Sequence, residues 1–213
     1  MTTLQRVLWS EGLFLTPHHF QQWDRYHEDL VSFRLRALST FGWGAEELKF
    51  NEEALENGLF EVVRCRTVLP DGIPIDAPDA DALPPARSFV ELFSPTSDRI
   101  DVFLAIPILR PNAPNVALGA GTSHQPARYV PSQWTIPDEN TGENPRPVTF
   151  ASKNLRLIFG DEPLDNHTAL KIAEVRRTVE GEHQSDVEGE VEQVPDQLSV
   201  YQPYLDRVPA APQ

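Results

Sequence analysis

From residue 17 onward, the apolar residues near the amino end recur at the spacing of an amphipathic helix. Thr16 can act as an N-cap for free backbone N–H groups, and Pro17 suits the first helical position because its φ is already helical. Gly42 and Gly44 allow the backbone to leave helical geometry. We therefore predict a helix over residues 16–40, with an inward face made of Phe20, Trp23, His27, Leu30, Val31, Ala37 and Leu38.

The residues before this helix, 1–15, form a short apolar segment that we call the arm. Its large side chains lie on both faces of an extended chain, so it has to be covered on two sides. Two interpretations remain open: a buried strand of the same domain, or an arm that binds a partner chain. Under the second, the partner-binding residues are Leu8, Trp9, Glu11, Gly12, Leu13, Phe14 and Leu15.

The helix would hold this arm at a defined angle. Leu15 and Phe20 have the spacing of a hydrophobic staple, which fixes how the chain enters a helix. The residues expected to start and anchor the helix are Thr16, Pro17, Phe20 and Trp23.

Beyond residue 44 the chain consists of short apolar runs separated by prolines and turn signals. The sequence contains 20 prolines, concentrated after the helix, which makes further long helices unfavourable. Runs rich in β-branched and aromatic residues predict strands. We predict a mainly β fold, a β-sandwich over residues 41–200, with strands within 59–68, 89–93, 100–109, 148–150, 155–159 and 170–179.

Local patterns predict the environment of some of these segments. In the run 59–68, Phe60, Val62 and Arg64 alternate with Val63, Cys65 and Thr67, so we expect a strand covered on both sides. The proline- and aspartate-rich residues 73–85 are expected to form an ordered surface loop, and residues 119–142 another loop.

The charge of the chain excludes several classes of partner. Its formal net charge is −14, with 18 Lys and Arg against 32 acids, which argues against nucleic acid and anionic membranes. Many of the acids fall within residues 178–196, a pattern typical of a solvated strand or hairpin; the alternative is a handle for a basic partner. With no apolar run of about 18 residues and no signal peptide, we expect a cytoplasmic protein without membrane insertion.

The residues that could carry chemistry do not form a convincing site. His18, His19, Asp24, His27 and Glu28 are the densest cluster, but their spacing does not suit a helical metal site. We instead expect His19 to be buried and hydrogen-bonded near the helix start, and His27 to lie on a half-buried face.

Nucleophile and phosphate-binding motifs are also incomplete. Ser123 and His124 lack a nucleophile elbow, and the glycines at 119 and 121 lack the lysine of a P-loop. Cys65, the single cysteine, lies in a strand-like run where cysteine is usually a core residue. We therefore predict no catalytic residue, no metal and no cofactor.

The segment from Trp9 to Gln21 resembles the N-terminus of the TssK family of type VI secretion baseplate subunits. The family pattern W-x-E-G-x-x-L-x-P-x-H-x-Q stands here as Trp9, Glu11, Gly12, Leu15, Pro17, His19 and Gln21. Two later stretches resemble the same family, 68–72 followed by 76–78, and 154–160 leading into 170–175. The resemblance covers nearly the whole chain, apart from the acidic run and the 119–142 loop.

This resemblance implies a trimeric, non-enzymatic subunit with a β-sandwich similar to the shoulder domain of siphophage receptor-binding proteins. It implies that the arm docks on the wedge proteins TssF and TssG, and that a C-terminal head binds the membrane complex. Residues 201–213 would then be a truncated linker towards the neck. The alternative function is a carbohydrate- or receptor-binding β-sandwich, in which Trp43, Trp134 or Tyr129 would stack on a sugar.

Overall fold

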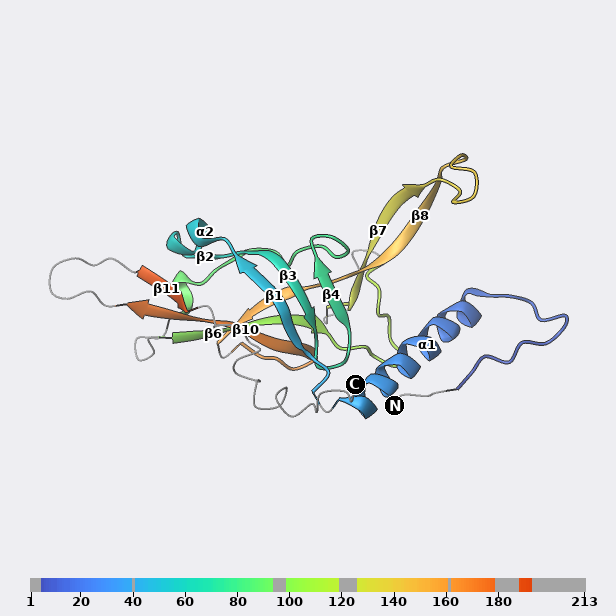
Figure 1. Cartoon of the computed structure of the whole chain (residues 1–213), viewed down its shortest axis with the longest axis horizontal. Coiled ribbons are helices and arrows are strands. Elements are labelled where there is room, and N and C mark those ends of the chain that lie inside the picture. Colours follow the sequence, from blue (N-terminus) through green and yellow to red (C-terminus); the bar gives the residue numbers. More distant parts are fainter. Residues whose placement is uncertain are drawn as a thin grey trace, which may run out of the picture. The chain divides into compact units, whose positions relative to one another are not determined.

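The computed structural model describes residues 5–39, 41–93, 99–118, 126–160, 162–178 and 188–192. The chain divides into two compact units, Met1–Trp43 and Gly44–Gln213 (Figure 1). The expected segment 201–213 lies outside the described residues.

The first unit contains helix α1, Pro17–Leu38, and the arm before it. Thr16 has extended backbone angles and Pro17 is the first helical residue, as predicted. The helix ends at Leu38, where the N–H of Ser39 donates to the carbonyl of Leu35 at 2.9 Å. The predicted helix is therefore confirmed.

Two antiparallel sheets form the body of the second unit. One has the order β1-β3-β4, with β1 Gly44–Phe50, β3 Val62–Val68 and β4 Pro74–Ala77. The other has the order β11-β10-β6-β9, with β6 Arg99–Pro107, β9 Arg156–Phe159, β10 His167–Thr178 and β11 Glu188–Glu192. Smaller elements lie at one end: α2 Glu52–Glu56, β2 Leu59–Phe60 paired with β5 Arg87–Ser88, and the 3₁₀ turn η1 Val90–Leu92.

The apolar faces of the two sheets meet in one core. Phe60 contacts Phe159 edge-on, with ring centroids 6.0 Å apart, and Phe50 lies 4.9 Å from Phe60. Alternating residues of β6, β9 and β10 face the same core, with Leu104, Ile106, Leu157, Ile172 and Val175 fully or almost fully buried. Burial of this area is the main stabilising contribution to the unit. The predicted mainly β sandwich is confirmed.

The expectation that β3 is covered on both sides is wrong. Lys49 pairs with Arg64 but Phe50 pairs with Val62, so Val63 is an extra residue that bulges out of the ladder. The bulge shifts the alternation by one, which places Val62, Cys65 and Thr67 in the core and leaves Val63 exposed. Only one face of β3 is buried as a result.

Two other local expectations are also wrong. Residues 74–77 form strand β4 rather than a loop, with Ile75 and Ala77 buried; the flanking prolines are tolerated because β4 pairs only with β3 at the sheet edge. Residues 90–92 form a 3₁₀ turn rather than a strand, since the N–H of Leu92 donates to the carbonyl of Phe89. Only Phe89 of this run is buried.

A two-stranded hairpin projects from the sandwich (Figure 1). Strand β7, Tyr129–Ile136, pairs antiparallel with β8, Arg146–Lys153, over eight residue pairs. The segment 148–150 was expected in a strand, whereas residues 129–136 were expected in a loop. That second expectation is wrong.

Candidate protein-binding surface

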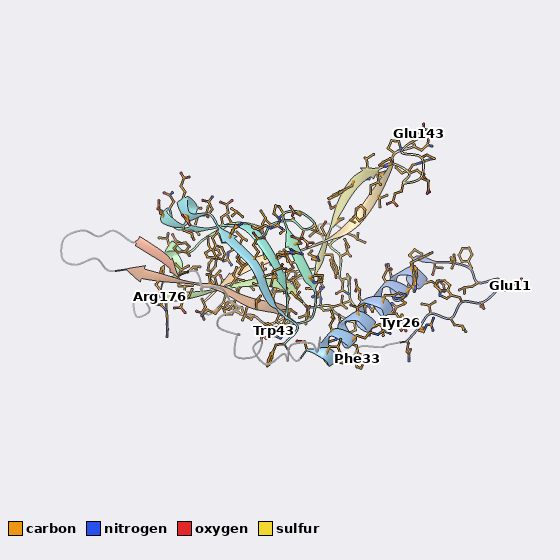
Figure 2. The ribbon with its side chains drawn as sticks, in the orientation of Figure 1. Glu11, Tyr26, Phe33, Trp43, Glu143 and Arg176 are labelled. Atoms are coloured by element: carbon orange, nitrogen blue, oxygen red, sulfur yellow. The ribbon has the colours of Figure 1, made fainter. Side chains whose placement is uncertain are left out.

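The arm contains a tight turn at its centre. The N–H of Leu13 donates to the carbonyl of Ser10 at 3.2 Å, and Gly12 between them has a φ of 79°. A positive φ at this position favours glycine, and no atom lies near the place a Cβ would occupy. Gly12 is therefore required for its backbone angle rather than for space. Glu11, at the tip of this turn, lies at the end of the arm farthest from α1 (Figure 2).

Aromatic contacts fold the arm back along helix α1. The indole of Trp9 meets Trp23 edge-on at 6.5 Å between centroids and lies 6.3 Å from the ring of His19. The Arg6 guanidinium lies 6.0 Å from the ring centre of Tyr26. The arm thus has a defined course along the helix, with Trp9 as its main anchor.

The helix start is stabilised by His19 in the role that Glu or Gln has in a capping box. The N–H of Thr16 donates to Nδ1 of His19 at 3.1 Å, and Oγ1 of Thr16 lies 2.9 Å from the same nitrogen. His19 is hydrogen-bonded as predicted, but it is half-buried rather than buried. His27, expected on a half-buried face, is exposed and contacts Trp23 and Tyr26 through its ring.

Three other large side chains of the arm remain exposed, whereas Leu13 is half-buried. Leu8 and Phe14 are each 83% exposed, and Leu15 is about half exposed. The segment is not a strand, so the interpretation of a buried strand is wrong. Contiguous exposed apolar groups of this kind are typical of interaction sites.

Helix α1 itself has no buried residue. The predicted inward residues Phe20, Trp23, Val31 and Leu38 are exposed, as are Phe33 and Leu35. The predicted partners in the staple, Leu15 and Phe20, each keep about half of their surface exposed.

A second exposed apolar surface lies on the hairpin, and sequence patterns did not reveal it. Residues paired across an antiparallel ladder share a face. The register places Trp134 beside Val148 and Ser132 beside Phe150, so one face carries five apolar side chains. We call this the hairpin face: Val130, Trp134, Ile136, Val148 and Phe150.

The aromatic residues of the hairpin face contact each other rather than the core. Trp134 and Phe150 lie 5.8 Å apart between ring centroids, and the indole N–H donates to Oγ of Ser132 at 2.8 Å. Trp134 is nevertheless 59% exposed. A ligand covering this indole would leave no N–H unsatisfied.

The residues named as alternatives for stacking on a sugar lie in different places within their own units. Tyr129 and Trp134 have opposite parity on β7 and therefore lie on opposite faces of the hairpin. Trp43 belongs to the first unit, where its ring lies 6.4 Å from Phe41.

The residues considered for catalysis or metal binding have no such arrangement in the part of the chain that the structure describes. Cys65 is fully buried, and burial raises the pKa of its thiol to about 12, which suppresses the reactive thiolate. Within the described residues, no three His, Cys, Asp or Glu side chains group as metal ligands. Ser123 and His124 lie outside the described residues, as does most of the acidic segment 178–196.

The chain matches known proteins along most of its length. Residues 19–188 match the model of the bacterial type VI secretion family that includes EvfL, ImpJ and VasE. It is 38% identical over 177 residues to the type VI secretion baseplate component TssK1 of Pseudomonas aeruginosa. The chain belongs to the TssK family of baseplate components. Proteins of this family are structural rather than enzymatic, as predicted.

Solved structures of TssK proteins share the fold. A TssK crystal structure superposes with a TM-score of 0.74 at 26% identity, over 89% of this chain and 41% of that one. A TssK–TssF–TssG baseplate subcomplex contains a chain with a TM-score of 0.76 at 23% identity, over 88% of this chain and 60% of that one.

The match covers only part of these longer proteins. The chain spans 39% of the length of the Pseudomonas relative, while that match includes 83% of the chain. In the part of the chain that the structure describes, no helix has the length and apolar character needed to span a membrane.

Proposed function

We propose that this chain forms the wedge-binding part of a TssK-type subunit of the cytoplasmic baseplate. Three copies assemble, and each arm docks on the wedge proteins TssF and TssG through its residues Leu8–Leu15. The solved subcomplex of a similar chain with TssF and TssG supports this choice of partners. In the full-length protein, the part beyond this chain links the baseplate to the membrane complex.

The observation that carries the proposal is the division of the arm into positioning and contact residues. Trp9 packs on Trp23 and His19, and Gly12 sets the turn, so the arm is held in a defined shape. Leu8 and Phe14 remain 83% exposed. Pre-ordering lowers the entropy lost on binding, and large exposed apolar groups act as the energetic anchors of interfaces.

A binding experiment with purified TssF–TssG complex tests this assignment. The double variant Leu8→Ser/Phe14→Ser should bind at least about tenfold more weakly, since each lost anchor removes roughly 1–2 kcal/mol. A matched control outside the family pattern, Gln22→Ser/Glu28→Gln on exposed helix positions, should bind like the wild type. Equal binding of the wild type and the Leu8/Phe14 variant would show that the arm is not the contact.

Trp9→Ala separates positioning from contact. It removes the anchor that holds the arm on α1 but leaves the contact residues Leu8 and Phe14 unchanged. Binding to TssF–TssG should therefore weaken less than in the Leu8→Ser/Phe14→Ser variant. Light scattering on the full-length protein checks the proposed trimer, and a monomeric mass would contradict it.

A further inference from the structure

The hairpin is built as a rigid projection whose apolar side remains uncovered. An isolated two-stranded hairpin is only marginally stable in water. This one extends away from the sandwich, with Glu143 near its far end (Figure 2). Its hairpin face exposes Trp134, Phe150, Val130 and Val148, which contribute little to the core.

The base of the hairpin is clamped to the sandwich by polar contacts. Buried Arg128 donates to Asp71 through Nη2 at 2.7 Å and to the carbonyl of Pro107 through Nη1 at 2.8 Å. At the end of β8, Lys153 pairs with Asp81 at 2.7 Å, and both side chains are largely buried. Charged pairs on both strands therefore hold the hairpin in one orientation.

A third contact closes the base between the two strands. Asn154 donates from its side chain to the carbonyl of Ala127 at 2.7 Å, and its N–H donates to the carbonyl of Arg128 at 2.9 Å. Since such a clamp limits motion at the base, the hairpin face is pre-oriented for a ligand.

The edges of the hairpin are blocked against pairing with another strand. Tyr129 uses its outward N–H and carbonyl to bond Asn115 and Ala117. Pro131 is the next residue on β7 whose backbone groups point away from β8. On β8, the backbone groups of Pro147 also point outward, because its partner Thr135 alternates in step with Tyr129 and Pro131. Proline offers no N–H, so both edges resist strand addition. The interrupted edges therefore favour binding to the face.

Charge distinguishes the possible occupants of that face. Near the tip, the hairpin carries three acids, Asp138, Glu139 and Glu143, against one base, Arg146, which pairs with Ile136 on the hairpin face. The first 43 residues contain four arginines and four acids, so the whole net charge of −14 lies in Gly44–Gln213. The acidic tip would attract a partner with basic side chains next to its apolar contact.

We propose that the hairpin face is a second docking surface, bound by an apolar ridge flanked by Lys or Arg side chains on a baseplate partner. This inference rests on the proposed function, which supplies that partner class. Trp134 and Phe150 would be the anchors, and Glu139 and Glu143 would steer the basic flank.

The test measures binding of the chain to purified TssF–TssG complex. Trp134→Ser/Phe150→Ser should bind at least about tenfold more weakly, as expected for loss of aromatic anchors. The matched control Gln133→Ser/Thr149→Ser changes the neighbouring pair on the opposite face and should bind like the wild type. Glu139→Gln/Glu143→Gln should mainly reduce the salt dependence of association.

Each outcome decides the proposal. Equal binding of the Trp134/Phe150 variant and its control would overturn it, and would leave the proposed function standing if the Leu8/Phe14 variant still lost binding. A loss of self-association in light scattering, with wedge binding intact, would identify a second copy as the occupant and would also overturn it. Absence of binding by the wild type would overturn both proposals.

Discussion

The sandwich and the hairpin are both antiparallel β-structure, yet they use apolar side chains for different purposes. In the core of the sandwich, Phe60 of β2 meets Phe159 of β9, and both are fully or almost fully buried. In the hairpin, Trp134 and Phe150 meet on one face that no second layer covers. The same alternation thus stabilises the fold where a second sheet faces it, and leaves a binding surface where none does.

The largest expected difference is in how much an aromatic side chain contributes to stability in the sandwich and in the hairpin. Phe60→Ala should lower the free energy of unfolding by about 3–5 kcal/mol because it leaves a cavity between the sheets. Trp134→Ala should lower it by less than about 1 kcal/mol, since that ring loses mainly one aromatic contact. Denaturant titration measures both losses, and similar losses would show that Trp134 stabilises the fold as much as a core residue does.

The ion pair of Arg128 and Asp71, which joins the hairpin to the sandwich, should give the next largest effect on stability. Arg128→Met should lower the free energy of unfolding by about 3 kcal/mol because it leaves the partly buried carboxylate of Asp71 without its cation. Hydrogen exchange at the base of β7 should accelerate. Adding Asp71→Asn, which keeps the acceptor for the N–H of Ile73, should recover part of the loss; no recovery would mean that the pair is not the clamp.

Within the sandwich, a smaller effect should appear as a dependence of the free energy of unfolding on pH. The two terminal guanidinium nitrogens of Arg87, Nη1 and Nη2, donate to Glu162 at 2.8 and 2.7 Å, and these hydrogen bonds lower the pKa of Glu162 below its ordinary value of 4.5. The stability from this pair is therefore complete above pH 4.5 and is lost as the pH falls through the lowered pKa.

Glu162→Gln should lower the free energy of unfolding by about 1 kcal/mol at neutral pH. The difference from the wild type should shrink as the pH falls below 4.5. Urea titrations across this range provide the measurement. A difference that stays constant with pH would exclude the ion pair as its cause.

Several elements could be predicted because their signals are local. Thr16 and Pro17 mark the helix start through backbone chemistry that needs no distant partner. The strands around 100–109 and 155–159 follow from short apolar runs. The prediction failed at β4, where prolines on both sides of Ile75 and Ala77 obscured a short alternation.

The two candidate binding surfaces, the arm and the hairpin face, also differ in whether their signal is local in the sequence. The apolar residues of the arm were recognised because they are concentrated in one segment, although the sequence left open whether they are buried or exposed. The hairpin face was missed because its residues come from two strands and acquire a common face only through their register.

By itself, the sequence determined the helix, the β class and the family, since each depends on neighbouring residues or on a contiguous motif. Only the tertiary structure decided which apolar residues are covered. The bulge at Val63 and the pairing of Trp134 with Val148 are properties of strand registers. Burial depends on what lies opposite a residue in space, which no local pattern specifies.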